Sequence, residues 1–91
     1  MYNLIFTESY EAKARKFFKK HSELRSQYEK VLGLLELNPY HPSLRLHKVN
    51  IHGNEVFSVS INMSYRITID LLIDESEIIP INIGSHDDVY K

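Results

Sequence analysis

The chain has 91 residues, of which 43% are hydrophobic and 25% are charged, with three glycines and three prolines. This composition is typical of a single ordered globular domain covering residues 1–91, and it excludes a disordered or low-complexity segment. The lack of cysteine excludes disulfides and cysteine zinc sites. No stretch resembles a signal peptide or a membrane span, so we expect a cytoplasmic protein without membrane contact.

The net charge of −1 hides an uneven distribution along the chain. Residues 1–50 carry nine Lys and Arg against five Asp and Glu, or +4, whereas residues 51–91 carry two against seven, or −5. Most of the basic residues fall where we expect helix, and local positive potential governs phosphate binding more than net charge does. These residues could contact nucleic acid, although a solvated helix face would have the same pattern.

The chain begins with a predicted strand and a predicted helix. Residues 2–6 are aromatic and β-branched enough for a strand, and Thr7 or Ser9 then offers a hydroxyl N-cap to a helix that runs to about His21. The apolar residues of this helix recur at helical spacing, which indicates one buried stripe. They are Tyr10, Ala14, Phe17 and Phe18.

A second helix is predicted to follow after a very short turn. Ser22 provides its capping hydroxyl, and the helix ends at Asn38 because Pro39 disfavours helical backbone in the residue before it. Its apolar stripe consists of Leu24, Tyr28, Val31, Leu32 and Leu35. The two amphipathic helices thus form a helical hairpin with one buried side.

After Pro42 the hydrophobic period changes from about 3.6 to about 2 residues, which predicts strands. The alternating segments are residues 44–47, 57–61, 65–71 and 79–84. Residues 62–64 and 74–76 are short links, so the strands are expected to form an antiparallel meander. Pro80 lacks a donor for the strand ladder and therefore indicates either a sheet edge or a bulge.

Strand parity divides the side chains of this sheet between two faces. One face is apolar and needs the two helices as its cover, which predicts a two-layer α+β domain. The residues expected on this apolar face are Leu44, Leu46, Phe57, Val59, Ile61, Tyr65, Ile67, Ile69, Ile79, Ile81 and Ile83. The opposite face is expected to be open and polar, with Arg45, His47, Ser58, Ser60, Arg66, Thr68, Asn82 and, just beyond the strand, His86.

Three residues of the polar face could cleave RNA without a metal. Such cleavage needs a base for the 2′-hydroxyl proton, an acid for the leaving 5′-oxygen and a cation for the charge on the phosphate. His47, His86 and Arg66 suit these roles, because histidine titrates near neutral pH and arginine keeps a fixed charge. Tyr90 could stack on a nucleobase.

Each of these residues also has a structural alternative. The histidines would then be solvated, Arg66 would pair with Asp70, and Tyr90 would be a frayed terminal residue. No cofactor is expected, because His41, His47 and His52 lack the spacing and the neighbouring carboxylates of a metal site.

The order of elements and three motifs resemble the RelE/ParE superfamily of bacterial type II toxins, and in particular its RelE- and YafQ-like mRNA interferases. The motifs are Leu-Arg-Leu-His-Lys at residues 44–48, Ser-Tyr-Arg-Ile at 64–67 and Ile-Gly-Ser-His-Asp-Asp-Val-Tyr at 83–90. The resemblance covers essentially the whole chain. It implies a RelE-like microbial RNase fold and a toxin that cuts mRNA in the ribosomal A site. It also implies a cognate antitoxin, held with the toxin in a hetero-oligomer.

The resemblance also implies roles for the matching residues. His47 is similar to a general-base candidate of the family, Arg66 to its transition-state arginine, His86 to its C-terminal acid or base, and Tyr90 to its substrate-placing aromatic. Further substrate contacts are expected at Arg45, Lys48 and Ser60, and contacts with ribosomal RNA at Lys13, Lys16, Lys19 and Lys20.

Two other functions fit the same fold. ParE-like members of the superfamily inhibit DNA gyrase by binding, and they lack the RNase residues. A catalytically weak interaction module would bind its partner without cleaving RNA. Expressing the chain alone, and then with its neighbouring open reading frame, would separate the three.

Overall fold

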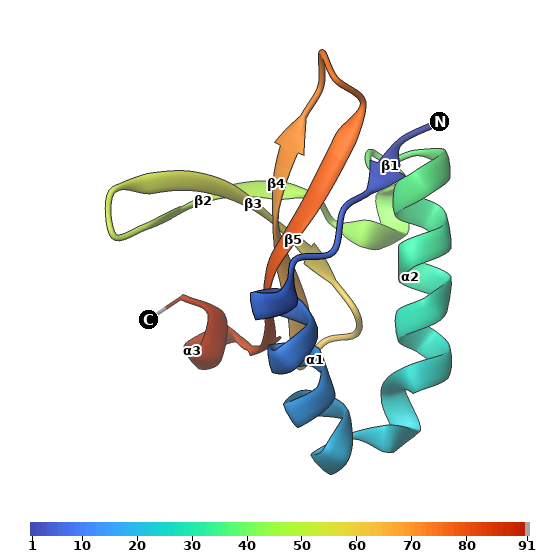
Figure 1. Cartoon of the computed structure of the whole chain (residues 1–91), viewed down its shortest axis with the longest axis vertical. Coiled ribbons are helices and arrows are strands. Elements are labelled where there is room, and N and C mark those ends of the chain that lie inside the picture. Colours follow the sequence, from blue (N-terminus) through green and yellow to red (C-terminus); the bar gives the residue numbers. More distant parts are fainter. Residues whose placement is uncertain (91) are drawn as a thin grey trace.

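A computed structural model describes residues 1–90 and contains a mixed five-stranded sheet with helices against both faces (Figure 1). The elements in chain order are β1 (Asn3–Leu4), α1 (Glu8–Lys20), α2 (Arg25–Leu37), β2 (His47–Ile51), β3 (Asn54–Ser60), β4 (Tyr65–Leu72), β5 (Glu77–Ser85) and α3 (His86–Val89). The strand order is β1-β5-β4-β3-β2, with β1 parallel to β5 and the other pairs antiparallel. The predicted meander and α+β class are therefore confirmed. None of the helices in residues 1–90 is long and apolar enough to span a bilayer.

The first helix begins as predicted, whereas the second does not. The backbone N–H of Tyr10 donates to Oγ of Thr7 at 3.1 Å, so Thr7 caps α1. Ser22, in contrast, opens a 3₁₀ turn at Ser22–Leu24, and α2 follows it without a side-chain cap. The prediction that Ser22 caps α2 is wrong, because the tight 3₁₀ turn itself joins the two helices and leads directly into α2.

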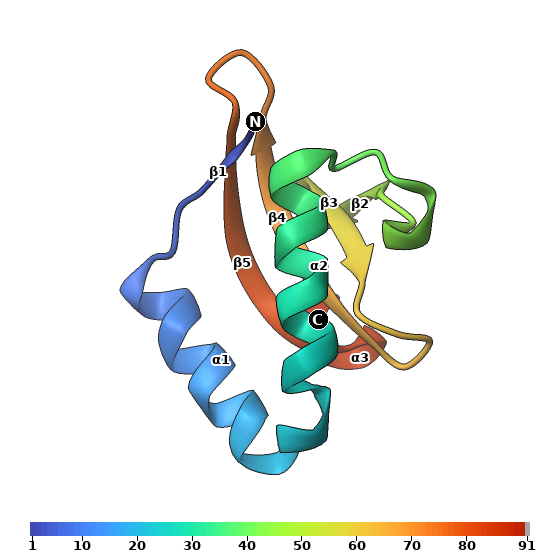
Figure 2. The same cartoon turned by 90° about the vertical axis from the view of Figure 1, so that its right-hand side faces the viewer.

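The two helices and one face of the sheet enclose the hydrophobic core. Figure 2 shows α2 lying across the sheet, while α1 runs beside β5. The hydroxyls of Tyr10 and Tyr28 lie 2.9 Å apart and connect the two helices. Burial raises the pKa of both hydroxyls above the usual tyrosine value. The core residues are Tyr10, Phe17, Phe18, Tyr28, Val31, Leu35, Leu44, Val59, Ile61, Ile67, Ile69, Leu71, Ile78 and Ile83.

The segment at residues 44–47 is not a strand, which corrects the first of the four alternating segments. Pro42–Leu44 forms a 3₁₀ turn, and Arg45 has a left-handed backbone with φ of 52°. β2 therefore starts only at His47. It pairs with β3 through a two-residue turn whose positive φ angles, 51° at His52 and 82° at Gly53, fit the right-handed twist of a hairpin.

A β-bulge in β5 changes the predicted parity of that strand. Thr68 pairs with Asn82 but Ile69 pairs with Pro80, so Ile81 is one extra residue. The slip moves Ile78 and Pro80 into the core and leaves Ile81 with 37% of its surface exposed. The prediction that Ile79 and Ile81 face the core is wrong, and the bulge at Pro80 is confirmed.

Candidate active site

The C-terminal segment folds back over the polar face of the sheet as the short helix α3. Ser85 and Asp88 form a capping box: the Asp88 N–H donates to Ser85 Oγ at 3.3 Å, and the Ser85 N–H donates to Asp88 Oδ2 at 3.1 Å. The reversal brings the chain so close to itself that a Cβ on Gly84 would lie 2.7 Å from Asp88 Cβ. Only glycine fits this position without a shift of α3. The reversal places α3 against β4 and β5.

Tyr90 lies at the centre of the residues that α3 brings together. Its hydroxyl donates to Ser58 Oγ at 2.8 Å and accepts from Arg66 Nη1 at 3.4 Å. The Arg66 guanidinium carbon lies 5.8 Å from the centroid of the Tyr90 ring. The His86 ring meets the same ring edge to face, with the centroids 4.3 Å apart. An arginine and a histidine from different parts of the chain thus converge on one tyrosine.

His47 lies on the same face of the sheet as Tyr90, as its pairing with β3 shows. It pairs with Ser58 across β2 and β3, so its side chain lies on the face that Tyr90 contacts. Its Nδ1 lies 2.9 Å from the backbone oxygen of Arg45. A carbonyl oxygen only accepts, so Nδ1 is the donor, and the neutral ring carries its lone pair on Nε2. That arrangement suits a proton acceptor.

The polar face is less open than predicted. Ser58 is 0% exposed and Thr68 is 1% exposed, because α3 and Tyr90 lie against this face. Tyr90 itself is partly buried and hydrogen-bonded, so it is not a frayed end. Among residues 1–90, no carboxylate lies within ion-pair distance of Arg66, so the alternative pairing with Asp70 is absent. Arg66 contacts Tyr90 instead.

Two of the three other predicted substrate contacts lie beside this cluster, and one does not. Ser60 pairs directly with Arg66 across the strands. Ser60 and Arg45 line the same small hollow of about 160 Å³. Lys48 alternates with His47 and therefore lies on the other side of β2, where its Nζ is 3.6 Å from Glu55 Oε1. The structure does not bring Lys48 to the site.

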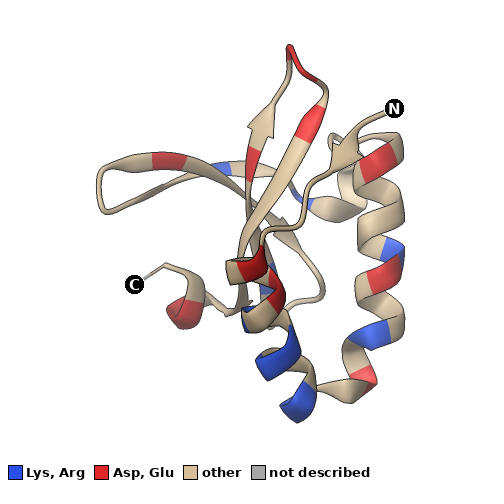
Figure 3. Ribbon diagram, in the orientation of Figure 1, with Lys and Arg blue, Asp and Glu red and all other residues tan. Residues whose placement is uncertain are grey.

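The basic half of α1 lies across a groove from α3. Figure 3 shows blue residues gathered in the C-terminal half of α1. Three of them, Lys13, Lys16 and Lys20, line a groove of about 370 Å³ together with Asn82 and Asp88. Lys13 also donates to the backbone oxygen of Ile81 at 3.3 Å. Lys19 does not line this groove, although it follows Lys16 by three residues and is therefore its neighbour on the helix surface.

Neither α3 nor the contact between Ser58 and Tyr90 was predicted from the sequence. Ser85 followed three residues later by Asp88 is a local signal for a helix start, but nothing local shows that Tyr90 returns to Ser58, 32 positions earlier. In residues 1–90, no group of three or more His, Asp or Glu side chains is arranged to hold a metal ion.

Comparison with known proteins identifies the fold. No protein-family model and no curated protein sequence matches the chain. Solved structures do match over almost its full length. A metal-bound toxin from Helicobacter pylori has a TM-score of 0.79 at 15% identity, covering 99% of this chain and 100% of that one. YafQ from E. coli has a TM-score of 0.78 at 11% identity, covering 100% of both chains.

A third similar structure is that of a complex. In the E. coli DinJ-YafQ toxin-antitoxin complex, the matching chain has a TM-score of 0.77 at 12% identity, covering 99% of this chain and 98% of that one. The protein thus has the fold of the RelE- and YafQ-like toxins, as its motifs implied. At such low identity, the likeness is one of fold.

Proposed function

We propose that this protein is the toxin of a type II toxin-antitoxin pair and that it is an endoribonuclease acting on mRNA at the ribosome. The observation that carries this proposal is the convergence of Arg66 and His86 on Tyr90, whose hydroxyl donates to the cross-strand partner of His47. A base, an acid and a fixed cation at one place are the groups that metal-free RNA cleavage requires. The fold shared with YafQ supports the same class of function.

The residues present suit an in-line transfer within the RNA. His47 Nε2 accepts the proton of the 2′-hydroxyl as the 2′-oxygen bonds to phosphorus. His86, as an imidazolium, donates a proton to the 5′-oxygen as the bond from phosphorus to that oxygen breaks. Arg66 stabilises the charge that builds on the phosphate oxygens, and the products are a 2′,3′-cyclic phosphate and a free 5′-hydroxyl. Tyr90 positions the substrate, and Arg45 and Ser60 extend the contact surface.

The proposed partners follow from charge and from the similar structures. Lys13, Lys16, Lys19 and Lys20 would contact ribosomal RNA, since clustered lysines bind phosphates through their local potential. A cognate antitoxin would bind the toxin in a hetero-oligomer, as in the DinJ-YafQ complex, and both would act in the cytoplasm, where the ribosomes are.

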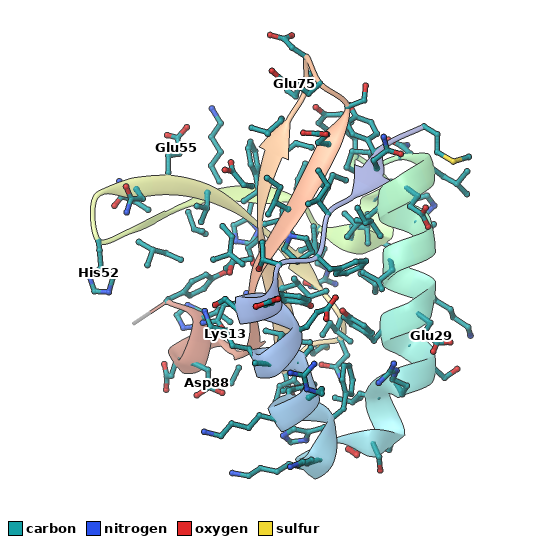
Figure 4. All side chains as sticks on the ribbon, in the orientation of Figure 1. Lys13, Glu29, His52, Glu55, Glu75 and Asp88 are labelled. Carbon is teal, nitrogen blue, oxygen red and sulfur yellow. The ribbon has the colours of Figure 1, made fainter. Side chains whose placement is uncertain are left out.

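The experiment compares the wild-type protein with His86→Ala and Glu75→Ala in a translating extract. His86 is exposed on α3, so its loss should leave the fold intact, and Glu75 is an exposed residue in the distant turn between β4 and β5 (Figure 4). We expect His86→Ala to slow mRNA cleavage by about 10²- to 10⁴-fold, and Glu75→Ala to leave it unchanged. Full cleavage by His86→Ala would exclude His86 as a catalytic group. Intact mRNA with wild-type protein, together with blocked DNA supercoiling by purified gyrase, would replace this function with gyrase inhibition.

A further inference from the structure

A groove of about 510 Å³ continues the polar face beyond Tyr90, between the β2–β3 hairpin, α1 and α3. Figure 4 shows His52 on the hairpin and Lys13 on α1 at opposite sides of this region. The lining includes the apolar side chains of Ile51, Val56 and Val89 as well as the polar residues Thr68 and Asp70. Apolar walls with a few polar groups are typical of small-molecule sites, and the volume lies within their range of about 300–1,000 Å³.

Thr68 is the polar group in this groove that lacks a partner. It is 1% exposed, and its Oγ1 is buried without a hydrogen bond to any atom of residues 1–90. Leaving a buried hydroxyl unpaired costs free energy, so such a group needs an explanation. Its Oγ1 is closed to water in this conformation, so a ligand seated in the groove would supply the missing hydrogen bond once Thr68 rotates about its Cα–Cβ bond and turns the hydroxyl toward the groove.

Asp70 supplies a second polar contact two residues further along β4, on the same face as Thr68. Its carboxylate is exposed and, within residues 1–90, forms no ion pair. The Glu55 carboxylate pairs with Lys48 on the other side of the hairpin, so the charges left in the groove are those of Lys13 and Asp70, which balance each other. A groove without net positive charge favours an uncharged ligand that offers hydrogen-bond donors to Asp70.

The groove connects directly to the proposed cleavage site. Thr68 is the cross-strand partner of Ser58, which accepts the hydrogen bond of Tyr90, and Val89 in the groove wall precedes Tyr90 in the chain. A nucleotide whose phosphate lies at Arg66 and Tyr90 would therefore have its neighbouring base at the groove. Apolar side chains on the walls would cover the two faces of that base.

Guanine matches the polar groups best. Its N1–H and N2–H donors are adjacent, and together they fit the two oxygens of one carboxylate, which only accepts. The corresponding edges of adenine and cytosine each place an acceptor beside the donor, and uracil has a single donor between two carbonyls. We propose that this groove binds a guanine base of the RNA next to the cleaved bond, with Asp70 as the residue that determines this specificity. This inference rests on the proposed RNase function.

The first test measures binding and does not require cleavage. GMP and AMP differ only in the base, and each is titrated into the protein while the amide resonances are followed by NMR. We expect GMP to shift the resonances of Thr68 and Asp70 at concentrations about tenfold or more below those needed for AMP. Asp70→Asn should lose this preference, because its amide places a donor opposite a guanine donor. Asp74→Asn, in the exposed turn after β4, is the matched control and should keep the preference.

The second test sequences the ends of cleaved mRNA. With the wild-type protein we expect guanine to be enriched next to the cleaved bond, and with Asp70→Asn we expect the enrichment to vanish while cleavage continues. Cleavage with an unchanged base preference in Asp70→Asn would overturn the guanine site and leave the RNase function standing. Selective GMP binding without any mRNA cleavage would support the site and overturn the RNase function. Equal shifts by GMP and AMP would overturn the site outright.

Discussion

Replacing Tyr90 with phenylalanine tests whether the C-terminal segment is fastened to the sheet as the structure indicates. The change keeps the ring against His86 and Arg66, and it removes the hydroxyl that donates to Ser58 at 2.8 Å. Because Ser58 is 0% exposed, water cannot replace the lost partner while α3 stays in place. An unpaired buried hydroxyl costs about 1–3 kcal/mol.

The expected loss of unfolding free energy is about 2 kcal/mol, since the contact with Arg66 at 3.4 Å is long and adds little. For a domain of this size such a loss lowers the melting temperature by roughly 8–16 °C. Detachment of α3 would let water reach Ser58, so the loss cannot exceed the free energy that holds α3 against the sheet.

The assay is urea denaturation followed by circular dichroism, on a double-mutant cycle of Tyr90→Phe and Ser58→Ala. In the Ser58→Ala background the hydroxyl acceptor is gone, so Tyr90→Phe should cost at least about 1 kcal/mol less than in the wild type. Tyr40→Phe, at a 54% exposed tyrosine, is the control and should change stability by less than about 0.5 kcal/mol. Additive effects of Tyr90→Phe and Ser58→Ala would refute the contact.

Two further predictions concern stability. Gly84→Ala should destabilise the protein by about 1–3 kcal/mol, because the new Cβ would lie 2.7 Å from Asp88 Cβ. Gly33→Ala is the control: this position in α2 has open space around it, so the change should stabilise the protein by up to about 1 kcal/mol in the same urea assay. Equal effects of the two substitutions would contradict this reasoning. Because burial raises the pKa of Tyr10 and Tyr28, their stabilising contribution should be complete below about pH 10 and should fall as the pH rises further. The urea concentration at the unfolding midpoint should therefore fall more steeply between pH 8 and 11 for the wild type than for the double variant Tyr10→Phe/Tyr28→Phe. An equal fall of the midpoint with pH in both proteins would argue against the raised pKa of these tyrosines.

Local patterns in the sequence determined most of the architecture. The apolar stripes of α1 and α2 follow the helical repeat, and the alternation in β3 and β4 assigned Ser58, Arg66 and Thr68 to one face of the sheet. These patterns are reliable because each depends only on the geometry of its own element and on the need to bury one side.

The tertiary structure decided what local patterns could not express. The bulge in β5 reversed the parity of Ile79 and Ile81, because a slip of one residue moves every following side chain to the other face. The return of Tyr90 to Ser58 and Arg66 turned a face expected to be open into a partly covered site. Both features depend on pairings between residues far apart in the chain. Close packing and buried hydrogen bonds stabilise these pairings, and neither produces a periodic pattern in the sequence.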